Sequence, residues 1–139
     1  MLQVNTNKIA LKVLSVPVKE KRSIPAFGDG WRKDLLSVSI QNGIQLIPIS
    51  DIWYLKANSN YTEIYGSKGR ILLSSKTLQR FEDKLSAFPF VRAHQSYLVH
   101  LSRIDWYEFG QQSKIYLHNG VSLPVSRSRK ARLLSLLTF

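Results

Sequence analysis

From Leu35 onward the sequence consists of short segments in which apolar and polar residues alternate, separated by turn-forming residues. Leu36, Val38 and Ile40 alternate with serines before Asn42–Gly43, a dipeptide that accommodates the positive φ angles of a tight hairpin turn. Similar segments follow at residues 44–49, 52–57, 61–65, 70–74, 90–93, 103–109, 113–117 and 121–125. Because a period of two is typical of strands with one buried face, these segments are predicted to be β-strands.

Two segments have the spacing of a helix instead. The first is predicted to end before Pro89 and carries apolar residues at intervals of three and four: Leu78, Phe81, Leu85 and Phe88. The second is predicted to use Ser126 as its N-cap and to turn four leucines inward: Leu133, Leu134, Leu136 and Leu137. Residues 94–101 fit either a strand or a single helical turn. The predicted fold class is therefore mainly β, with about nine or ten short strands in small antiparallel sheets and two helices.

Residues 1–34 differ in pattern from the rest of the chain. Ile9, Leu11 and Val13 alternate as in one strand, and residues 16–30 have the Pro, Gly and charged residues of a linker. We therefore expect an N-terminal arm of unknown role at residues 1–34 and one domain at residues 35–139.

The charge balance points to a polyanionic partner. Twenty Lys and Arg against nine Asp and Glu give a net charge of +11, of which +7 falls in residues 35–139. Nucleic acid, an anionic membrane and an acidic protein all fit this excess. No cysteine occurs, which excludes disulfides and thiolate metal sites. No signal peptide and no run of about 18 apolar residues is present, so a cytoplasmic protein without a membrane partner is expected.

Catalytic patterns are weak in this sequence. The histidines His94, His100 and His118 have no metal-ligand spacing, and no glycine-rich phosphate-binding motif occurs. A small hydrolase that uses His94 with Ser96 is the remaining enzyme alternative, but nothing in the pattern activates the serine. We expect no enzymatic activity, no metal and no cofactor.

Three groups of residues can bind nucleic acid. Four cations fall within six residues at the start of the closing helix: Arg127, Arg129, Lys130 and Arg132. Such a cluster can bind phosphates, although it can also be a solvated helix end. Residues 58–62 place amides and hydroxyls at a hairpin tip, where they can contact base edges or simply form the turn. Residues 92–97 interrupt two apolar runs, with His94 either donating to a phosphate or fixing a turn.

Four ordered blocks of this sequence resemble the LytTR-type DNA-binding domain. They are Asp51–Ile52 with Ala57–Tyr61, Ser75–Leu78, Phe90–Val99 and Pro124–Arg127, and the resemblance spans residues 35–138. It implies a mainly antiparallel β fold that binds promoter DNA through loops rather than through a recognition helix. The tip after Ala57 is expected in one major groove and the segment from Ser126 in another.

The resemblance also implies roles for single residues. Base contacts are expected from Tyr61 or Thr62, from Gln95 and from Arg127, and backbone contacts from Ser96 and Lys130. Together with the residue patterns this gives the predicted DNA-binding set: Asn58, Asn60, Tyr61, Thr62, His94, Gln95, Ser96, Arg127, Arg129 and Lys130. Two positions depart from the family, since Gln95 stands where many members have Arg or Lys and His100 stands where Asn is more usual.

The predicted function is sequence-specific binding of double-stranded DNA by a transcriptional regulator, with two protomers on promoter repeats. No receiver domain fits in 34 residues, so the chain is expected to be either a stand-alone regulator or a piece of a longer protein. In the second case a sensor kinase or a receiver domain outside this chain would control it. The alternative is a basic interaction domain that binds RNA or an acidic protein surface.

Overall fold

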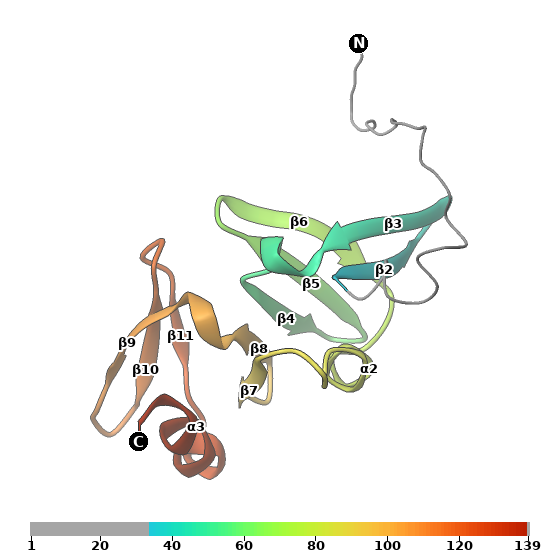
Figure 1. The fold of residues 1–139 in the computed structure, drawn as a ribbon. Coiled ribbons are helices and arrows are strands. Elements are labelled where there is room, and N and C mark those ends of the chain that lie inside the picture. Colours follow the sequence, from blue (N-terminus) through green and yellow to red (C-terminus); the bar gives the residue numbers. More distant parts are fainter. Residues whose placement is uncertain (1–33, 139) are drawn as a thin grey trace. The chain divides into compact units, whose positions relative to one another are not determined.

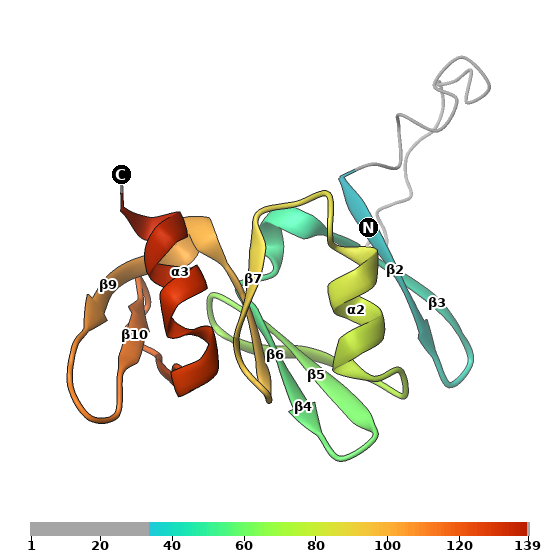
Figure 2. The same ribbon diagram turned by 90° about the horizontal axis from the view of Figure 1, so that it is seen from below.

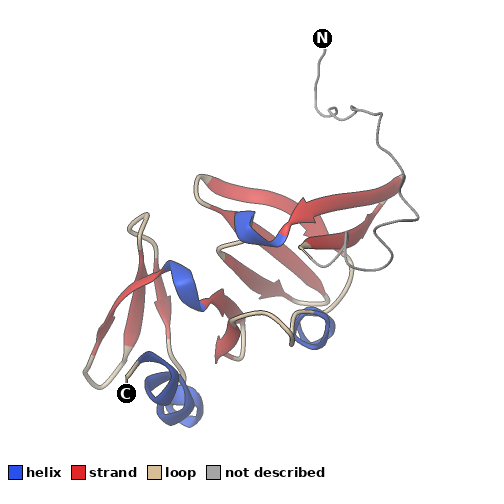
Figure 3. Ribbon diagram, viewed as in Figure 1, coloured by secondary structure: helices blue, strands red, loops and turns tan. Residues whose placement is uncertain are grey.

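A computed structural model describes residues 34–138 of the chain, so the predicted arm before Asp34 lies outside the described residues. Ten strands, two α-helices and three short 3₁₀ turns follow one another in this part, and strands predominate (Figure 3). All strand pairs are antiparallel and form sheets of two, five and three strands. The mainly β class with small antiparallel sheets and two helices is thereby confirmed.

The first two strands form a hairpin that covers one core. β2 (Leu35–Ile40) pairs with β3 (Gly43–Pro48), with Leu36 opposite Ile47. Leu36, Val38 and Ile47 are buried, Ser37 is half-buried, and Ser39 is exposed. Ile40 is exposed as well, so the predicted alternation holds at Leu36 and Val38 but not at the end of β2. A 3₁₀ turn, η2 (Ile49–Asp51), then leads into the large sheet.

The five-stranded sheet has the order β6-β5-β4-β8-β7 (Figure 1). Its members are β4 (Tyr54–Asn58), β5 (Tyr61–Gly66), β6 (Gly69–Ser74), β7 (Phe90–His94) and β8 (Tyr97–His100). Because β8 pairs with β4, two hairpins that are distant in sequence become neighbours. Their turns therefore lie at the same end of the sheet.

The first helix is shorter than its apolar spacing predicts. α2 (Leu78–Lys84) is capped by Thr77, whose hydroxyl accepts the Arg80 N–H at 3.4 Å. Leu85 is already the C-cap, yet it is buried, and the Phe88 N–H donates to its carbonyl at 3.0 Å. Leu85 and Phe88 thus reach the core from a turn, so the prediction of a helix up to Pro89 is wrong.

The three-stranded sheet has the order β11-β10-β9, with β9 (Ile104–Glu108), β10 (Lys114–Leu117) and β11 (Ser122–Pro124). Pro124 lies on an edge strand, as its missing N–H requires. Residues 94–101, which fit two alternatives in the sequence, contain strand β8 and the start of a 3₁₀ turn, η3 (Leu101–Arg103).

His100 caps that turn. Its Nδ1 accepts the Ser102 N–H at 3.3 Å and lies 2.8 Å from the Ser102 hydroxyl. Burial, with a smaller effect of the Arg103 charge, lowers the pKa of His100 below its ordinary value, so the neutral ring needed for capping is favoured. A histidine at this position therefore satisfies the turn as a short polar N-cap residue does.

The C-terminal helix also begins later and buries less than predicted. Ser126 precedes a 3₁₀ turn, η4 (Arg127–Arg129), and its hydroxyl makes no capping bond. α3 (Lys130–Leu137) follows, with Leu133 fully buried and Leu134 half-buried. Leu136 and Leu137 are exposed, so the expectation that all four leucines face inward is wrong.

Two apolar cores support these elements. One contains α2, the β2–β3 hairpin and part of the large sheet around Leu55, Ile64 and Leu98. The other joins β7 and β8 to the β9–β11 sheet and α3 through Val91, Val99, Ile115, Leu123 and Leu133. Because β7 and β8 contribute to both cores, the turn between them is supported from both sides.

Candidate nucleic-acid interface

The three predicted binding segments lie along one edge of the domain. They are the β4–β5 turn, the β7–β8 turn and the η4 segment that opens α3, all at the lower edge in Figure 2. Two backbone hydrogen bonds fix their order. The Ala57 N–H donates to the Ser96 carbonyl at 2.8 Å, and the Ser126 N–H donates to the Ala93 carbonyl at 2.9 Å. The β7–β8 turn is thus held between the other two segments.

The β4–β5 turn presents polar and aromatic side chains to solvent. Ser59 adopts a positive φ of 58°, which closes the turn between Asn58 and Tyr61. Asn60 is exposed, and Tyr61 keeps 49% of its surface accessible. Neither side chain has a hydrogen-bond partner in the described part of the chain, so both are available to a ligand.

Behind this tip lies a carboxylate that orders it. Glu63 is buried and accepts hydrogen bonds from the Tyr65 hydroxyl at 2.8 Å and from the Asn58 amide at 3.0 Å. These two bonds lower the pKa of Glu63 below its ordinary value of 4.5. Asn58 therefore has its amide nitrogen engaged and leaves its carbonyl oxygen for an outside donor.

Thr62 does not belong to the exposed set. Its side chain is fully buried, and its hydroxyl donates to the Lys76 carbonyl at 2.7 Å. This bond ties β5 to the segment that precedes α2. The prediction that Thr62 contacts DNA is wrong, because alternation places every second residue of β5 in the core.

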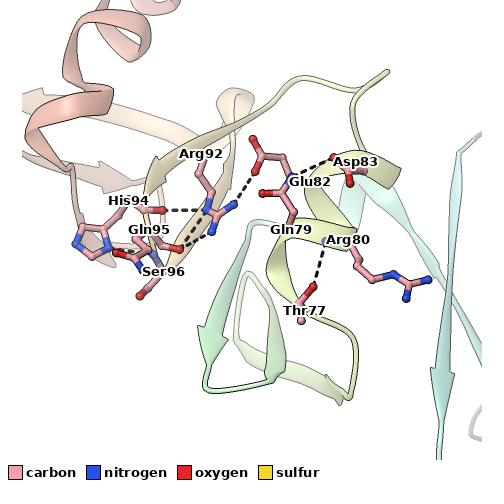
Figure 4. Close-up of polar contacts among 9 residues, drawn as sticks. All are labelled: Thr77, Gln79, Arg80, Glu82, Asp83, Arg92, His94, Gln95 and Ser96. Carbon is pink, nitrogen blue, oxygen red and sulfur yellow. Dashed lines mark hydrogen bonds and ion pairs between the residues drawn. The ribbon is translucent and has the colours of Figure 1, made fainter.

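Arg92 organises the β7–β8 turn (Figure 4). Its Nη1 lies 2.6 Å from the Glu82 carboxylate on α2, and its Nη2 donates to the Gln95 carbonyl at 2.6 Å. Its Nε also donates to the His94 carbonyl at 3.1 Å. One guanidinium thus fixes the backbone of the turn and joins it to α2.

The side chains of the turn itself remain directed to solvent or only partly engaged. Gln95 is exposed, and no bond within residues 34–138 uses its amide. His94 is half-buried, and its Nδ1 accepts the Ser96 N–H at 3.1 Å. In the neutral ring the proton then lies on Nε2, which can donate to a phosphate or base acceptor.

The same contact argues against a nucleophilic pair. His94 holds the Ser96 backbone, not the Ser96 hydroxyl, so the bond by which a base activates a serine is missing from this turn. The described residues also contain no group of three or more His, Asp or Glu side chains that could hold a metal ion.

The η4 segment carries the cations. Arg127 is exposed, and Arg129 and Lys130 are half-buried. Because the α-helix starts at Lys130, Arg127 and Arg129 lie in the 3₁₀ turn before it and not in its first α-turn. The Ser126 hydroxyl is buried there without a hydrogen-bond partner from the described residues.

These cations have no carboxylate partner among the residues that the structure covers. The nearest acidic groups in sequence, Asp105 and Glu108, contact His118 and Tyr116. Glu63 and Glu82 are engaged at the other two segments. The positive charge at η4 is therefore uncompensated, which favours a bound anion such as a phosphate backbone.

Sequence reasoning assigned no supporting role to Arg92, which it placed within the 92–97 group, and did not single out Glu63. Arg92 and Glu63 gave no signal by themselves, because a lone arginine or glutamate in a strand is usually solvated. A charged residue placed two positions before a polar turn, in an otherwise alternating strand, is the one pattern that could have indicated Arg92.

No helix within residues 34–138 is long and apolar enough to cross a bilayer.

Known proteins resemble this chain in sequence and in fold. A sequence model of the family described as LytTr DNA-binding domain matches residues 42–138. The positive alginate biosynthesis regulatory protein of Pseudomonas aeruginosa is 29% identical over 99 residues, which cover 71% of this chain and 36% of that protein. A sensory transduction protein LytT of Oceanobacillus iheyensis is 27% identical over 99 residues, which cover 68% of this chain and 40% of that protein.

The chain thus spans about two fifths of the length of these curated relatives. Among solved structures, the LytTr DNA-binding domain of a putative methyl-accepting/DNA response regulator from Bacillus cereus superposes with a TM-score of 0.63 at 26% identity. The similarity covers 77% of this chain and 99% of that one. The chain belongs to the LytTr DNA-binding domain family, whose members are DNA-binding domains of bacterial response regulators.

Proposed function

We propose that residues 35–139 bind double-stranded promoter DNA in a sequence-specific manner, with loops entering the major groove. The observation that carries this proposal is the alignment of three polar turns along one edge, next to cations that no carboxylate of residues 34–138 neutralises. Phosphate contacts give most of the affinity in such a complex, and contacts to base edges give the discrimination.

Each segment has a chemistry suited to one of these tasks. Asn60 and Tyr61 at the β4–β5 turn and Gln95 at the β7–β8 turn offer free donors and acceptors to base edges. Arg127 is the exposed guanidinium and suits guanine, while Arg129 and Lys130 suit phosphates. His94 and Ser96 lie between these positions, and Asn58 contributes its carbonyl oxygen.

The regulator would act in the cytoplasm on repeated sites, with one protomer on each repeat. Control is proposed to come from a receiver domain or a sensor kinase outside this chain, and residues 1–34 are proposed to be an arm of unknown role. The similarity to regulatory and sensory transduction proteins supports control of this kind.

Selection of duplexes from a random pool, followed by titration of the selected duplex at several salt concentrations, tests the proposal. Arg127→Ala is expected to lose about 1–3 kcal/mol and to relax the preference at one position. Lys130→Ala is expected to weaken all duplexes alike and to lower the salt slope by about one. Lys68→Ala is the matched control, because Lys68 is exposed in the β5–β6 turn at the opposite end of β5.

Recovery of no motif from the pool would refute sequence-specific reading. Equal and uniform losses in both variants would refute the assignment of Arg127 to base contact. Stronger binding of single-stranded RNA than of the selected duplex would favour the basic interaction domain instead.

A further inference from the structure

A fourth segment lies next to η4, at the same edge as the three proposed binding segments. The Val125 N–H donates to the Ser113 carbonyl at 3.0 Å, immediately before the Ser126 N–H bonds to β7. The loop between β9 and β10, residues 109–113, is therefore the next segment in the row after η4. It lies at the same lower edge of Figure 2.

The loop and η4 enclose an open hollow. The hollow has a volume of about 640 Å³ and is lined by Gly110, Gln111, Gln112, Ser113, Val125, Arg127 and Lys130. Two of these residues are the cations proposed above for base and phosphate contact. Two others are glutamines, both exposed, and no bond within the described residues uses their amides.

The conformation of the loop depends on Gly110 and Ser113 rather than on its glutamines. Gly110 has a φ of 152°, which residues with a side chain rarely adopt. Ser113 is buried, and its hydroxyl donates to the Gly110 carbonyl at 3.5 Å. The amides of Gln111 and Gln112 are thus carried on an ordered backbone, which limits the entropy lost when they bind.

We propose that the 109–113 loop is a fourth DNA-contacting segment, in which Gln111 and Gln112 contact the base pairs next to those that Arg127 contacts. An amide offers a donor and an acceptor side by side and can pair with the edge of an adenine. The proposal rests on the proposed function, since it adds a contact to the same duplex.

The test compares Gln111→Ala, Gln112→Ala and the double variant with the unchanged chain. Affinity for the selected duplex, and for duplexes substituted one base pair at a time, is measured by fluorescence anisotropy. The double variant is expected to bind the selected duplex about fivefold or more weakly and to lose preference beside the position that Arg127→Ala relaxes. Gln45→Ala, an exposed glutamine on β3, is the matched control.

The outcomes separate this inference from the proposed function. Unchanged affinity and unchanged preference in the double variant, with a motif recovered by the unchanged chain, would overturn the fourth contact alone. Failure to recover a motif, with affinity for a duplex of arbitrary sequence still lost in the double variant, would overturn sequence reading, including base contact by the two glutamines, but keep the loop as a contact to duplex DNA. Absence of duplex binding by the unchanged chain would overturn both. Since both glutamines are exposed, their removal should leave the melting temperature within about 2 °C of the original.

Discussion

Replacement of Arg92 by methionine tests how the β7–β8 turn is held. Methionine keeps the apolar stem of the side chain and removes the four hydrogen bonds of the guanidinium, three to backbone carbonyls and one to Glu82. The ion pair with Glu82 contributes about 0.5–1 kcal/mol, because the Glu82 side chain is 36% exposed and is screened by solvent. The His94 carbonyl loses one bond and the Gln95 carbonyl loses two that share the same acceptor oxygen, and we count about 1 kcal/mol for each carbonyl left without its donor.

The sum predicts that Arg92→Met lowers the free energy of unfolding by about 2.5–3 kcal/mol. For a domain of about 100 residues this corresponds to a fall of about 10 °C or more in melting temperature. Thermal unfolding followed by circular dichroism measures it. Titration of the selected duplex well below the melting temperature should also show lost preference at the base pair that the proposed complex assigns to Gln95.

Glu82→Gln is the matched variant for this experiment. It removes the charge of the partner and leaves the bonds from Arg92 to the two carbonyls in place, so it should cost about 1 kcal/mol or less. If both variants lowered the melting temperature equally, the carbonyl bonds would contribute nothing and the role of Arg92 as organiser of the turn would be refuted.

Three further predictions concern the framework of the domain. The hydrogen bond from Tyr65 lowers the pKa of Glu63, so the stability that the ionised Glu63 contributes is complete above pH 4.5 and is lost as the pH falls through the lowered pKa. Urea unfolding between pH 7 and pH 3 should show this loss of stability. The loss should be smaller in Glu63→Gln, which has no carboxylate to protonate at this position. Thr62→Val should lower the unfolding free energy by about 1 kcal/mol in urea titrations and leave base preference unchanged; a changed preference would restore Thr62 to the interface. Leu133→Ala should lower the unfolding free energy by about 2–5 kcal/mol, and Leu136→Ala by less than about 0.5, so equal losses in thermal melts would contradict the burial pattern of α3.

The strands were predictable because alternation has a direct physical cause. One face of each strand is buried, so a period of two in the sequence becomes a period of two in burial, as at Leu36 and Val38. Turn dipeptides such as Asn42–Gly43 and Asn119–Gly120 then separated the strands. The same reasoning, carried through β5, would have assigned Thr62 to the core.

The helices were less predictable because apolar spacing does not require a helix. Leu85 and Phe88 keep the helical interval but reach the core from a turn. Leu136 and Leu137 lie in α3 but are exposed. Burial depends on which element lies opposite, and that partner is chosen by the tertiary fold.

No local sequence pattern predicts that the three proposed binding segments lie side by side. It depends on backbone hydrogen bonds between Ala57 and Ser96 and between Ala93 and Ser126, which join residues more than 30 positions apart. These backbone groups do not depend on the residue type, so the sequence does not indicate where such a bond forms. Only the resemblance to a family could place these segments together before the structure was known.

The use of backbone carbonyls by Arg92 has an evolutionary consequence. The guanidinium binds the carbonyl oxygens at positions 94 and 95, which every amino acid provides, and it makes no demand on the side chain at position 95. In the proposed complex, replacement of Gln95 therefore alters the preferred DNA sequence without weakening the turn that carries it. A regulator built in this way can acquire new target promoters by single substitutions, while the stability of its scaffold stays under separate selection.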